Sequence, residues 1–147
     1  MGKIKLLFSK FDTPLELKTA PEIKAGFPST ADDYKLDAID FNRDMIRHPE
    51  STFYGRVYGD SMINAGIADG DIAVIDRLEE AKDGDIIVAF VNNEFTIKYL
   101  DLTHKEEGYI ELRPANDAFE PIRVDLHDDF RVWGVVVWTI RNCKHLK

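Results

Sequence analysis

From residue 53 onward the chain consists of short apolar stretches separated by polar turns. Stretches of this length that are rich in Val, Ile, Phe, Tyr and Trp are typical of β-strands. The pattern predicts strands over 53–58, 72–76, 86–91, 94–100, 109–113 and 131–140. Because no long helical period lies between them, we predict a mostly β fold, arranged as an antiparallel barrel or sandwich.

The predicted strands are joined by residues that favour tight turns. Asp-Gly-Asp occurs at 69–71 and again at 83–85, and Asn92-Asn93 fits a two-residue hairpin loop. The two Asp-Gly-Asp sequences lack the alternating ligands and the final Glu of a calcium loop. The four histidines are scattered without metal-ligand spacing, so we predict no metal site and no cofactor.

The two ends of the chain follow different patterns. Pro14, Pro21 and Pro28 interrupt regular structure, so the N-terminal part is predicted to be a flexible arm, with a possible short strand over 3–8. A short helix is predicted over 36–47, since Pro49 disfavours helix before it. The stretch 130–140 is apolar on both faces, which favours a strand buried on both sides or, alternatively, a dimer seam.

Composition and charge narrow the class of protein. The 147 residues suffice for one domain, and a net charge of −8 argues against a general nucleic-acid-binding protein. Residues 1–25 carry five lysines and three carboxylates, so a basic arm precedes an acidic remainder. The single cysteine, Cys143, excludes an internal disulfide and fits a reducing compartment. With no apolar run near the ~20 residues of a membrane span and no convincing signal peptide, we expect a cytoplasmic protein.

Ser61 and Lys98 are the candidate catalytic residues. Ser61 lies in Gly59-Asp60-Ser61-Met62, after one predicted strand, and Lys98 lies within another, 94–100. A serine hydroxyl needs a base before it can attack a carbonyl, and a lysine serves if it is kept neutral. If Lys98 is buried, desolvation lowers its pKa, and a shift from ~10.4 to ~7 amounts to about 4–5 kcal/mol.

Other residues could support this chemistry. Thr96 lies on the same strand face as Lys98, where its hydroxyl could orient the amine. A short helical turn is predicted over 61–65, so the backbone N–H groups of Ser61 and Met62 are candidates for an oxyanion hole. Upstream, Ala25-Gly26 is a small-residue dipeptide that could contain the bond attacked.

Each of these signals also has a simpler explanation. Gly-Asp-Ser is a common turn, and a lone Lys in a strand is usually an edge or solvent-facing residue. A Ser/His/Asp esterase also uses Gly-Asp-Ser, but this sequence has no late Asp-x-x-His pair and no alternation of strands with helices. We therefore reject the esterase.

Five segments, taken in order, resemble the LexA/UmuD family of self-cleaving Ser/Lys peptidases, and its UmuD-like members most closely. The likeness runs from about residue 25 to residue 140. The segments are 25–29, 59–63 with 66–71, 84–89, 94–98 and 132–136. Any one of them would be weak, whereas all of them in the family's order form a specific match.

The resemblance implies a function. Ser61 would be the nucleophile, Lys98 the general base, and Ala25–Gly26 the bond cut in the chain's own arm. The cut would remove an arm at 1–25 from a linker or extended segment at 26–52 and a compact LexA/UmuD-type peptidase β domain at 53–147. It would be stimulated by a RecA filament on single-stranded DNA. The product would work in the SOS response as a homodimer with a Y-family, UmuC-like translesion DNA polymerase.

One alternative from another class stays open. Residues 1–25 are too short for the helix-turn-helix of LexA-type repressors and the chain is acidic, so we expect no direct sequence-specific DNA binding. The lack of a long apolar run argues against membrane attachment. The chain could instead be a non-cleaving dimeric binding module of the same fold that acts by occupying partners. The presence of Ser61, Lys98 and Ala25–Gly26 in one chain favours self-cleavage.

Overall fold

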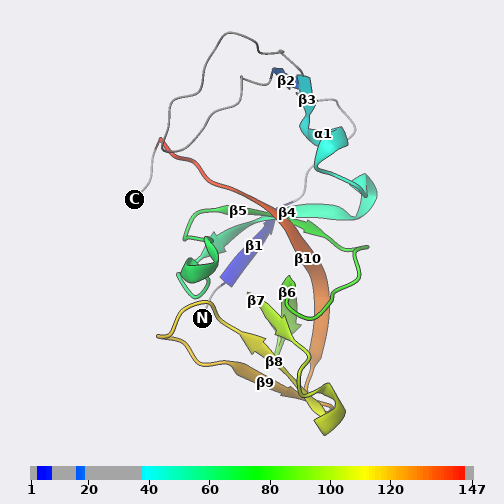
Figure 1. Cartoon of the computed structure of the whole chain (residues 1–147), viewed down its shortest axis with the longest axis vertical. Helices are drawn as coiled ribbons and strands as arrows, with labels where there is room; N and C mark the ends of the chain where they lie inside the picture. The colour runs from blue at the N-terminus through cyan, green and yellow to red at the C-terminus, as the bar shows by residue number, and fades with distance from the viewer. Residues whose placement is uncertain (1–2, 8–15, 19–37, 145–147) are drawn as a thin grey trace. The chain divides into compact units, whose positions relative to one another are not determined.

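The structure is a computed structural model of the 147-residue chain, and it describes residues 3–7, 16–18 and 38–144 (Figure 1). The chain divides into two compact units, of which the first is Met1–Ser9 with Ser51–Lys147 and the second is Lys10–Glu50. The first unit contains the main sheet and both candidate catalytic residues. No helix among the described residues is long and apolar enough to cross a membrane.

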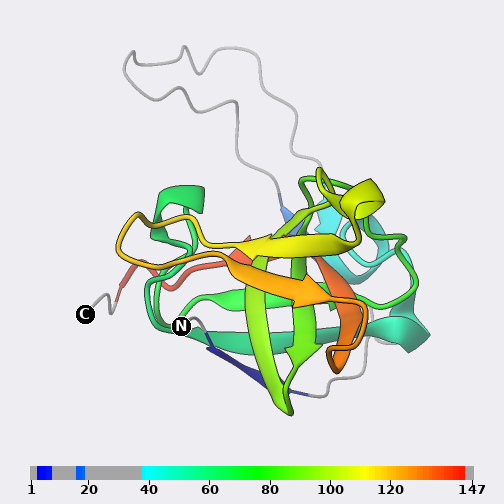
Figure 2. The same ribbon diagram turned by 90° about the horizontal axis from the view of Figure 1, so that it is seen from below.

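The main sheet has eight strands, all paired antiparallel. In spatial order they are β1 (Lys3–Leu7), β4 (Thr52–Tyr58), β5 (Ile72–Asp76), β10 (Phe130–Ile140), β6 (Ile86–Val91), β7 (Glu94–Asp101), β8 (Tyr109–Arg113) and β9 (Ile122–Asp125). The edge strand β1 also lies against β7, which shows that the sheet curls on itself, as Figure 2 also shows. The predicted mostly β, antiparallel fold is confirmed.

The strand β10 holds the two halves of the sheet together. It pairs with β5 through Val135–Ile140 and with β6 through Phe130–Val135, with a register shift in each pairing. Gly134 and Val135 in its middle are buried, whereas the side chains of Trp138 and Ile140 are 46% and 49% exposed. Val132, toward the other end of the strand, is also 38% exposed, so the prediction of a strand buried on both sides is wrong outside the middle of β10.

The described residues of the second unit lie mostly in short regular elements. This unit has a two-stranded antiparallel sheet of β2 (Glu16–Lys18) and β3 (Ala38–Asp40), followed by the helix α1 (Phe41–Asp44). A helix lies within the range predicted at 36–47 but is shorter, because the Asp40 carboxylate accepts hydrogen bonds from the N–H groups of Asn42 and Arg43 and so caps a helix that begins at Phe41. A 3-10 turn, η1 (Pro49–Ser51), precedes β4.

The core of the first unit consists of two apolar clusters. The first contains Ile4, Val57, Met62, Ile67, Ala73, Ile75, Val88 and Ile97. The second contains Ile87, Ala89, Val91, Leu100, Leu112, Val124 and Val135. Neighbouring residues of β6 thus belong to different clusters, because alternate side chains of a strand point to opposite faces. The sheet is therefore covered by apolar contacts on both faces around β6.

Turn chemistry accounts for the connections. Asn92 and Asn93 both have positive φ, at 50° and 66°, as the predicted two-residue hairpin between β6 and β7 requires. Two further 3-10 turns lie in loops, η2 (Ile63–Ala65) and η3 (Lys105–Glu107), and each ends at a glycine with positive φ. The turn η2 lies two residues after Ser61.

Candidate active site

Ser61 lies in the turn that follows β4. Gly59 has a φ of 88°, which an L-residue with a side chain rarely adopts, and its N–H donates to Asp69 Oδ1 at 2.7 Å. The chain therefore turns sharply away from the strand, and the Ser61 side chain is buried in the domain. The predicted helical turn over 61–65 is shorter than expected, since the 3-10 turn starts at Ile63.

A segment after β8 fixes the turn that carries Ser61. The Ala115 N–H donates to the Ser61 carbonyl at 2.8 Å, and the Asn64 N–H donates to the Ala115 carbonyl at 2.8 Å. The Asn116 side-chain amide donates to the Asp60 carbonyl at 3.0 Å. No sequence pattern points to Ala115, because its contribution is made by backbone groups that every non-proline residue has.

Lys98 comes from the middle of β7, directly opposite Ile87 of β6. Its side chain is 1% exposed. The Nζ atom lies 3.1 Å from Ser61 Oγ, 2.9 Å from Thr96 Oγ1 and 3.0 Å from the Ile97 carbonyl oxygen. The structure thus brings together the three side chains that the sequence suggested.

Burial sets the charge of this lysine. Desolvation lowers the pKa of Lys98 from 10.5 to about 8, because an ammonium loses more solvation than a neutral amine. About one molecule in ten then has a neutral amine at pH 7, compared with about one in a few thousand for an unperturbed lysine. The site can therefore supply a base at physiological pH.

The three contacts of Nζ match the needs of a neutral amine. A neutral lysine has two N–H donors and one lone pair, and both the Ile97 carbonyl and the Thr96 hydroxyl oxygen can accept an N–H. The lone pair is then free to accept the proton of the Ser61 hydroxyl. This arrangement is suited to activating a serine for attack on a carbonyl.

The backbone at Ser61 offers hydrogen-bond donors. The N–H groups of Ile63, Ala65, Gly66 and Ile67 all donate within the turn. Among the residues that the structure describes, no protein acceptor is found for the N–H groups of Ser61 and Met62. Their role as an oxyanion hole stays a prediction.

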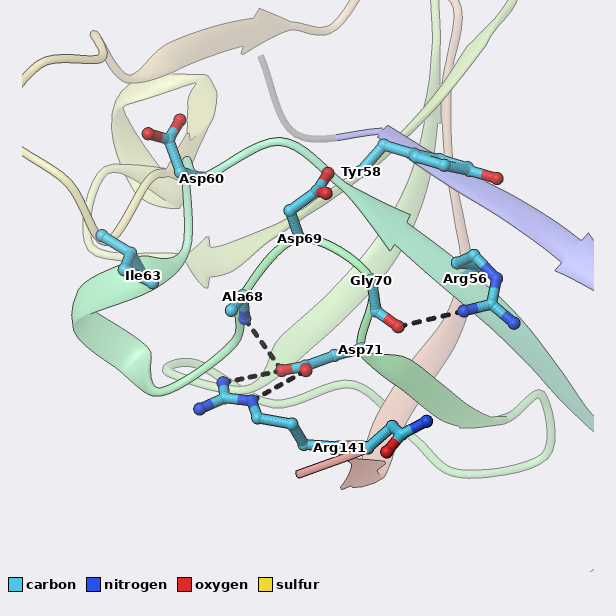
Figure 3. Close-up of a pocket in the computed structure, with 10 residues that line it drawn as sticks. Arg56, Tyr58, Asp60, Ile63, Ala68, Asp69, Gly70, Asp71 and Arg141 are labelled. Carbon is cyan, nitrogen blue, oxygen red and sulfur yellow. Dashed lines mark hydrogen bonds and ion pairs between the residues drawn. The ribbon is translucent and has the colours of Figure 1, made fainter. Parts of the chain in front are cut away.

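A cavity of about 540 Å³ adjoins this turn (Figure 3). Asp60 and Ile63, which flank the Ser61–Met62 pair, form part of its wall, and the buried Asp71 pairs with Arg141 across it. Burial would raise the pKa of Asp71, but hydrogen bonds from Arg141 and from the Ala68 N–H, with the charge of Arg141, hold it below its ordinary value. This ion pair fixes the chain beyond β10.

The cleavage site at Ala25–Gly26 stays a prediction. Ala25 and Gly26 lie outside the described residues. Across 3–7, 16–18 and 38–144, no group of three or more His, Cys, Asp or Glu side chains is placed to hold a metal ion. Cys143 is exposed and free.

The chain matches a known peptidase family and is similar to several bacterial proteins. The family described as Peptidase S24-like matches residues 17–137. The chain is 37% identical over 128 residues to Protein ImpA of Salmonella typhimurium, which covers 87% of this chain and 85% of that protein. It is 39% identical over 120 residues to Protein SamA of Salmonella typhimurium strain LT2, covering 82% and 81%. It is also 39% identical over 127 residues to the LexA repressor of Clostridium perfringens, covering 86% of this chain and 60% of the repressor.

Proposed function

Because the chain belongs to the S24-like peptidase family, we propose that it is a serine endopeptidase that cuts its own Ala25–Gly26 bond. The observation that carries the proposal is the buried contact of 3.1 Å between Lys98 Nζ and Ser61 Oγ. Burial lowers the pKa of Lys98 to about 8, so the base exists at neutral pH. The substrate is part of the same chain, which gives it a high effective concentration.

The proposed reaction proceeds in two steps. Ser61 Oγ attacks the Ala25 carbonyl carbon while Lys98 Nζ takes the hydroxyl proton, and the N–H groups of Ser61 and Met62 stabilise the oxyanion. The C–N bond then breaks, and Lys98 returns the proton to the leaving amine of Gly26. In the second step, water loses a proton to Lys98 and hydrolyses the ester between Ala25 and Ser61, which restores the free hydroxyl.

Thr96 is proposed to position Lys98. Its hydroxyl lies 2.9 Å from Nζ, and both residues are on the same face of β7. An amine held by two acceptors has one remaining direction for its lone pair. We therefore assign Thr96 to orientation of the base and Ser61 and Lys98 to the chemistry itself.

The biological role is proposed on the resemblance to UmuD-like proteins and on the relatives named above. A RecA filament on single-stranded DNA would speed cleavage by binding the competent conformation more tightly. The shortened product would be a homodimer that assists a Y-family polymerase. Exposure of Trp138 and Ile140 on β10 supports a dimer surface, since apolar residues at a strand end are suited to self-association.

Intact mass after incubation of the purified protein at mildly alkaline pH tests the proposal. We expect loss of residues 1–25 in the wild type and faster loss with added RecA and single-stranded DNA. Ser61→Ala and Lys98→Ala should abolish cleavage, whereas Lys82→Ala, at an exposed lysine, should leave it unchanged. Cleavage that persists in Ser61→Ala would refute the mechanism, and an inert wild type would favour the non-cleaving binding module.

A further inference from the structure

The first strand of the chain forms one edge of the main sheet. β1 pairs with β4, and Ile4 lies directly opposite Val57. β1 belongs to residues 1–25, which the proposed cut separates from the rest of the chain. The cut therefore removes the covalent link between an edge strand and its own sheet.

We infer that self-cleavage turns β4 into a docking edge for an extended segment of a partner protein. The segment that fits has an apolar residue opposite Val57 and a carboxylate opposite Arg56. The inference rests on the proposed self-cleavage. We call this surface the β4 edge, meaning the edge-facing backbone groups of Arg56 and Tyr58 together with the side chain of Val57.

The tether keeps β1 in place before the cut. A linked strand meets its partner at an effective concentration on the order of millimolar. After the cut, the described residues of the N-terminal piece hold the rest of the chain through five pairs in β1–β4, three pairs in β2–β3 and the packing of β1 against β7. Pairings this short are marginal on their own, so dilution favours dissociation or displacement.

The backbone of β4 shows which groups the departure of β1 leaves unpaired. The Val57 N–H donates to the Asp71 carbonyl at 2.8 Å, and the Val57 carbonyl accepts from the Gly70 N–H at 2.8 Å. Val57 therefore directs its backbone away from β1. Because successive residues of a strand direct these groups to opposite edges, Arg56 and Tyr58 direct theirs toward β1. A strand with such unpaired groups is a template for strand addition.

The side chains explain the preference for an apolar residue. Ile4 and Val57 are both buried members of the first apolar cluster. Removal of Ile4 uncovers Val57 and leaves a site shaped for a branched apolar side chain. A partner segment with such a residue at this register covers the cluster again.

Charge explains the preference for a carboxylate. The register places Lys5 directly opposite Arg56, so the two positions carry residues of like charge. Arg56 is exposed and donates through Nη1 to the Gly70 carbonyl at 3.2 Å. Like charges at opposite positions destabilise an antiparallel pair, and opposite charges stabilise it. An acidic segment therefore binds the β4 edge better than β1 does.

Amide hydrogen exchange followed by NMR tests whether the edge opens. The protein is the full chain with Ser61→Ala and a recognition sequence for a site-specific protease at the Ala25–Gly26 bond, so that cutting does not depend on self-cleavage. After the cut, we expect the Arg56 and Tyr58 amides to exchange at least about tenfold faster, as groups freed at a sheet edge do. The Val57 amide, which is bonded to the Asp71 carbonyl, should keep its protection.

Peptides then test the chemistry of the occupant. The probe is a synthetic peptide of residues 1–9 with Lys5→Glu, compared with the natural peptide and with one carrying Ile4→Asp. The Lys5→Glu peptide should bind the cut protein more tightly than the natural peptide, by a factor on the order of three to ten. The Ile4→Asp peptide should not bind the cut protein, and none of the three peptides should bind the uncut protein. In protein carrying Arg56→Glu, the preference should reverse toward the natural peptide.

Three outcomes would overturn the inference. One is unchanged protection of Arg56 and Tyr58 after the cut, which would show that β1 stays bound. Another is loss of protection at Val57 as well, which would show that the strand has unfolded instead of becoming an edge. The third is equal affinity for the two peptides, which would exclude charge as the determinant. A wild type that fails to cut itself would refute the proposed function and leave these three readings unaffected.

Discussion

Lys98 must be neutral to act as a base, so the activity of the site depends on its pKa. Its pKa of about 8 means that the base is protonated in most molecules at neutral pH. We predict that the rate of self-cleavage rises about tenfold per pH unit below about 8 and levels off above it. Initial rates from intact mass between pH 6 and 10 give the profile. A midpoint near 10 would contradict a desolvated lysine.

Thr96 is expected to affect the same profile in a different way. Thr96→Val removes the hydroxyl that lies 2.9 Å from Nζ while keeping the shape of the side chain. Hydrogen bonds stabilise an ammonium more than an amine, so the midpoint should move to lower pH. The plateau rate should fall by about tenfold, because the amine is less well oriented. A lower plateau with no change of midpoint would indicate a purely structural role, and the urea midpoint of the variant serves as the control.

Burial of Lys98 should also affect stability. The pKa of Lys98 is lower in the folded state than in the unfolded state. The stability that depends on this residue is therefore fully present above pH 10.5 and is lost as the pH falls through about 8. At pH 7 this amounts to a cost of about 3 kcal/mol. Lys98→Met should therefore raise the free energy of unfolding at pH 7, and the gain should shrink toward pH 10. Urea denaturation at pH 7 and at pH 10 measures this gain in the free energy of unfolding. An equal gain at the two pH values would refute the explanation.

The sequence predicts Ser61, Lys98 and Thr96 but not the contacts that hold the turn at Ser61. Ser61, Lys98 and Thr96 were found because their residue types matter to the chemistry, and their catalytic roles stay a prediction. Ala115 gave no signal because it acts through its backbone, and Asp69 was assigned to a turn although its carboxylate also accepts the Gly59 N–H. Contacts between segments that are far apart in the sequence form only in the folded sheet, so local sequence patterns do not predict them.

At the level of elements, turn residues predicted the fold better than helical patterns did. The hairpin at Asn92-Asn93 and all six predicted strands are present, with ends within one residue. β9 was missed because its four residues, Ile122–Asp125, alternate too briefly to stand out. The helix predicted over 36–47 is present but shorter, because the Asp40 cap starts it later than the apolar pattern suggested.

Gly134 in β10 is packed so closely that a side chain added there would clash with its neighbours. A Cβ atom there would lie 2.6 Å from Ile75 Cγ2 and 3.3 Å from the Asp76 carbonyl oxygen. Ile75 is fully buried, so its side chain has little space to move into. Gly134→Ala should therefore lower the free energy of unfolding by about 1–3 kcal/mol in urea titrations.

A double-mutant cycle shows whether this contact is the cause. Ile75→Ala removes the clashing Cγ2 atom. Gly134→Ala should then cost less in the Ile75→Ala background than in the wild type. Equal costs in both backgrounds would mean that the backbone at Gly134, and not the contact with Ile75, sets the effect.

At the scale of the molecule, the Asp71–Arg141 pair ties the chain beyond β10 to the start of β5. Arg141 Nε and Nη2 each lie 2.9 Å from the buried carboxylate. Arg141→Ala leaves that carboxylate without its cation, so we expect a measurable loss in the free energy of unfolding at pH 7. This is less than for a fully buried pair, because the Arg141 side chain is 38% exposed.

The pH dependence of this loss follows from the lowered pKa of Asp71. A lowered carboxyl pKa stabilises the fold above the unfolded value and loses that effect as the pH falls through the folded value. The difference between wild type and Arg141→Ala should therefore shrink below about pH 4. Arg123→Ala is the control, since its pair with Asp125 is exposed and should be worth under about 1 kcal/mol. A loss that is independent of pH would contradict the role of charge.

The central place of β10 has a consequence for how the protein is made. In the sheet, β4, which leads to Ser61, and β7, which carries Lys98, lie on opposite sides of β10. During translation both residues leave the ribosome well before Phe130–Ile140 does. A released chain truncated after residue 129 should therefore contain nucleophile and base and still be uncut, which gel analysis of the truncated chain can check. Synthesis of the last strand thus sets the earliest moment at which the chain can cut itself.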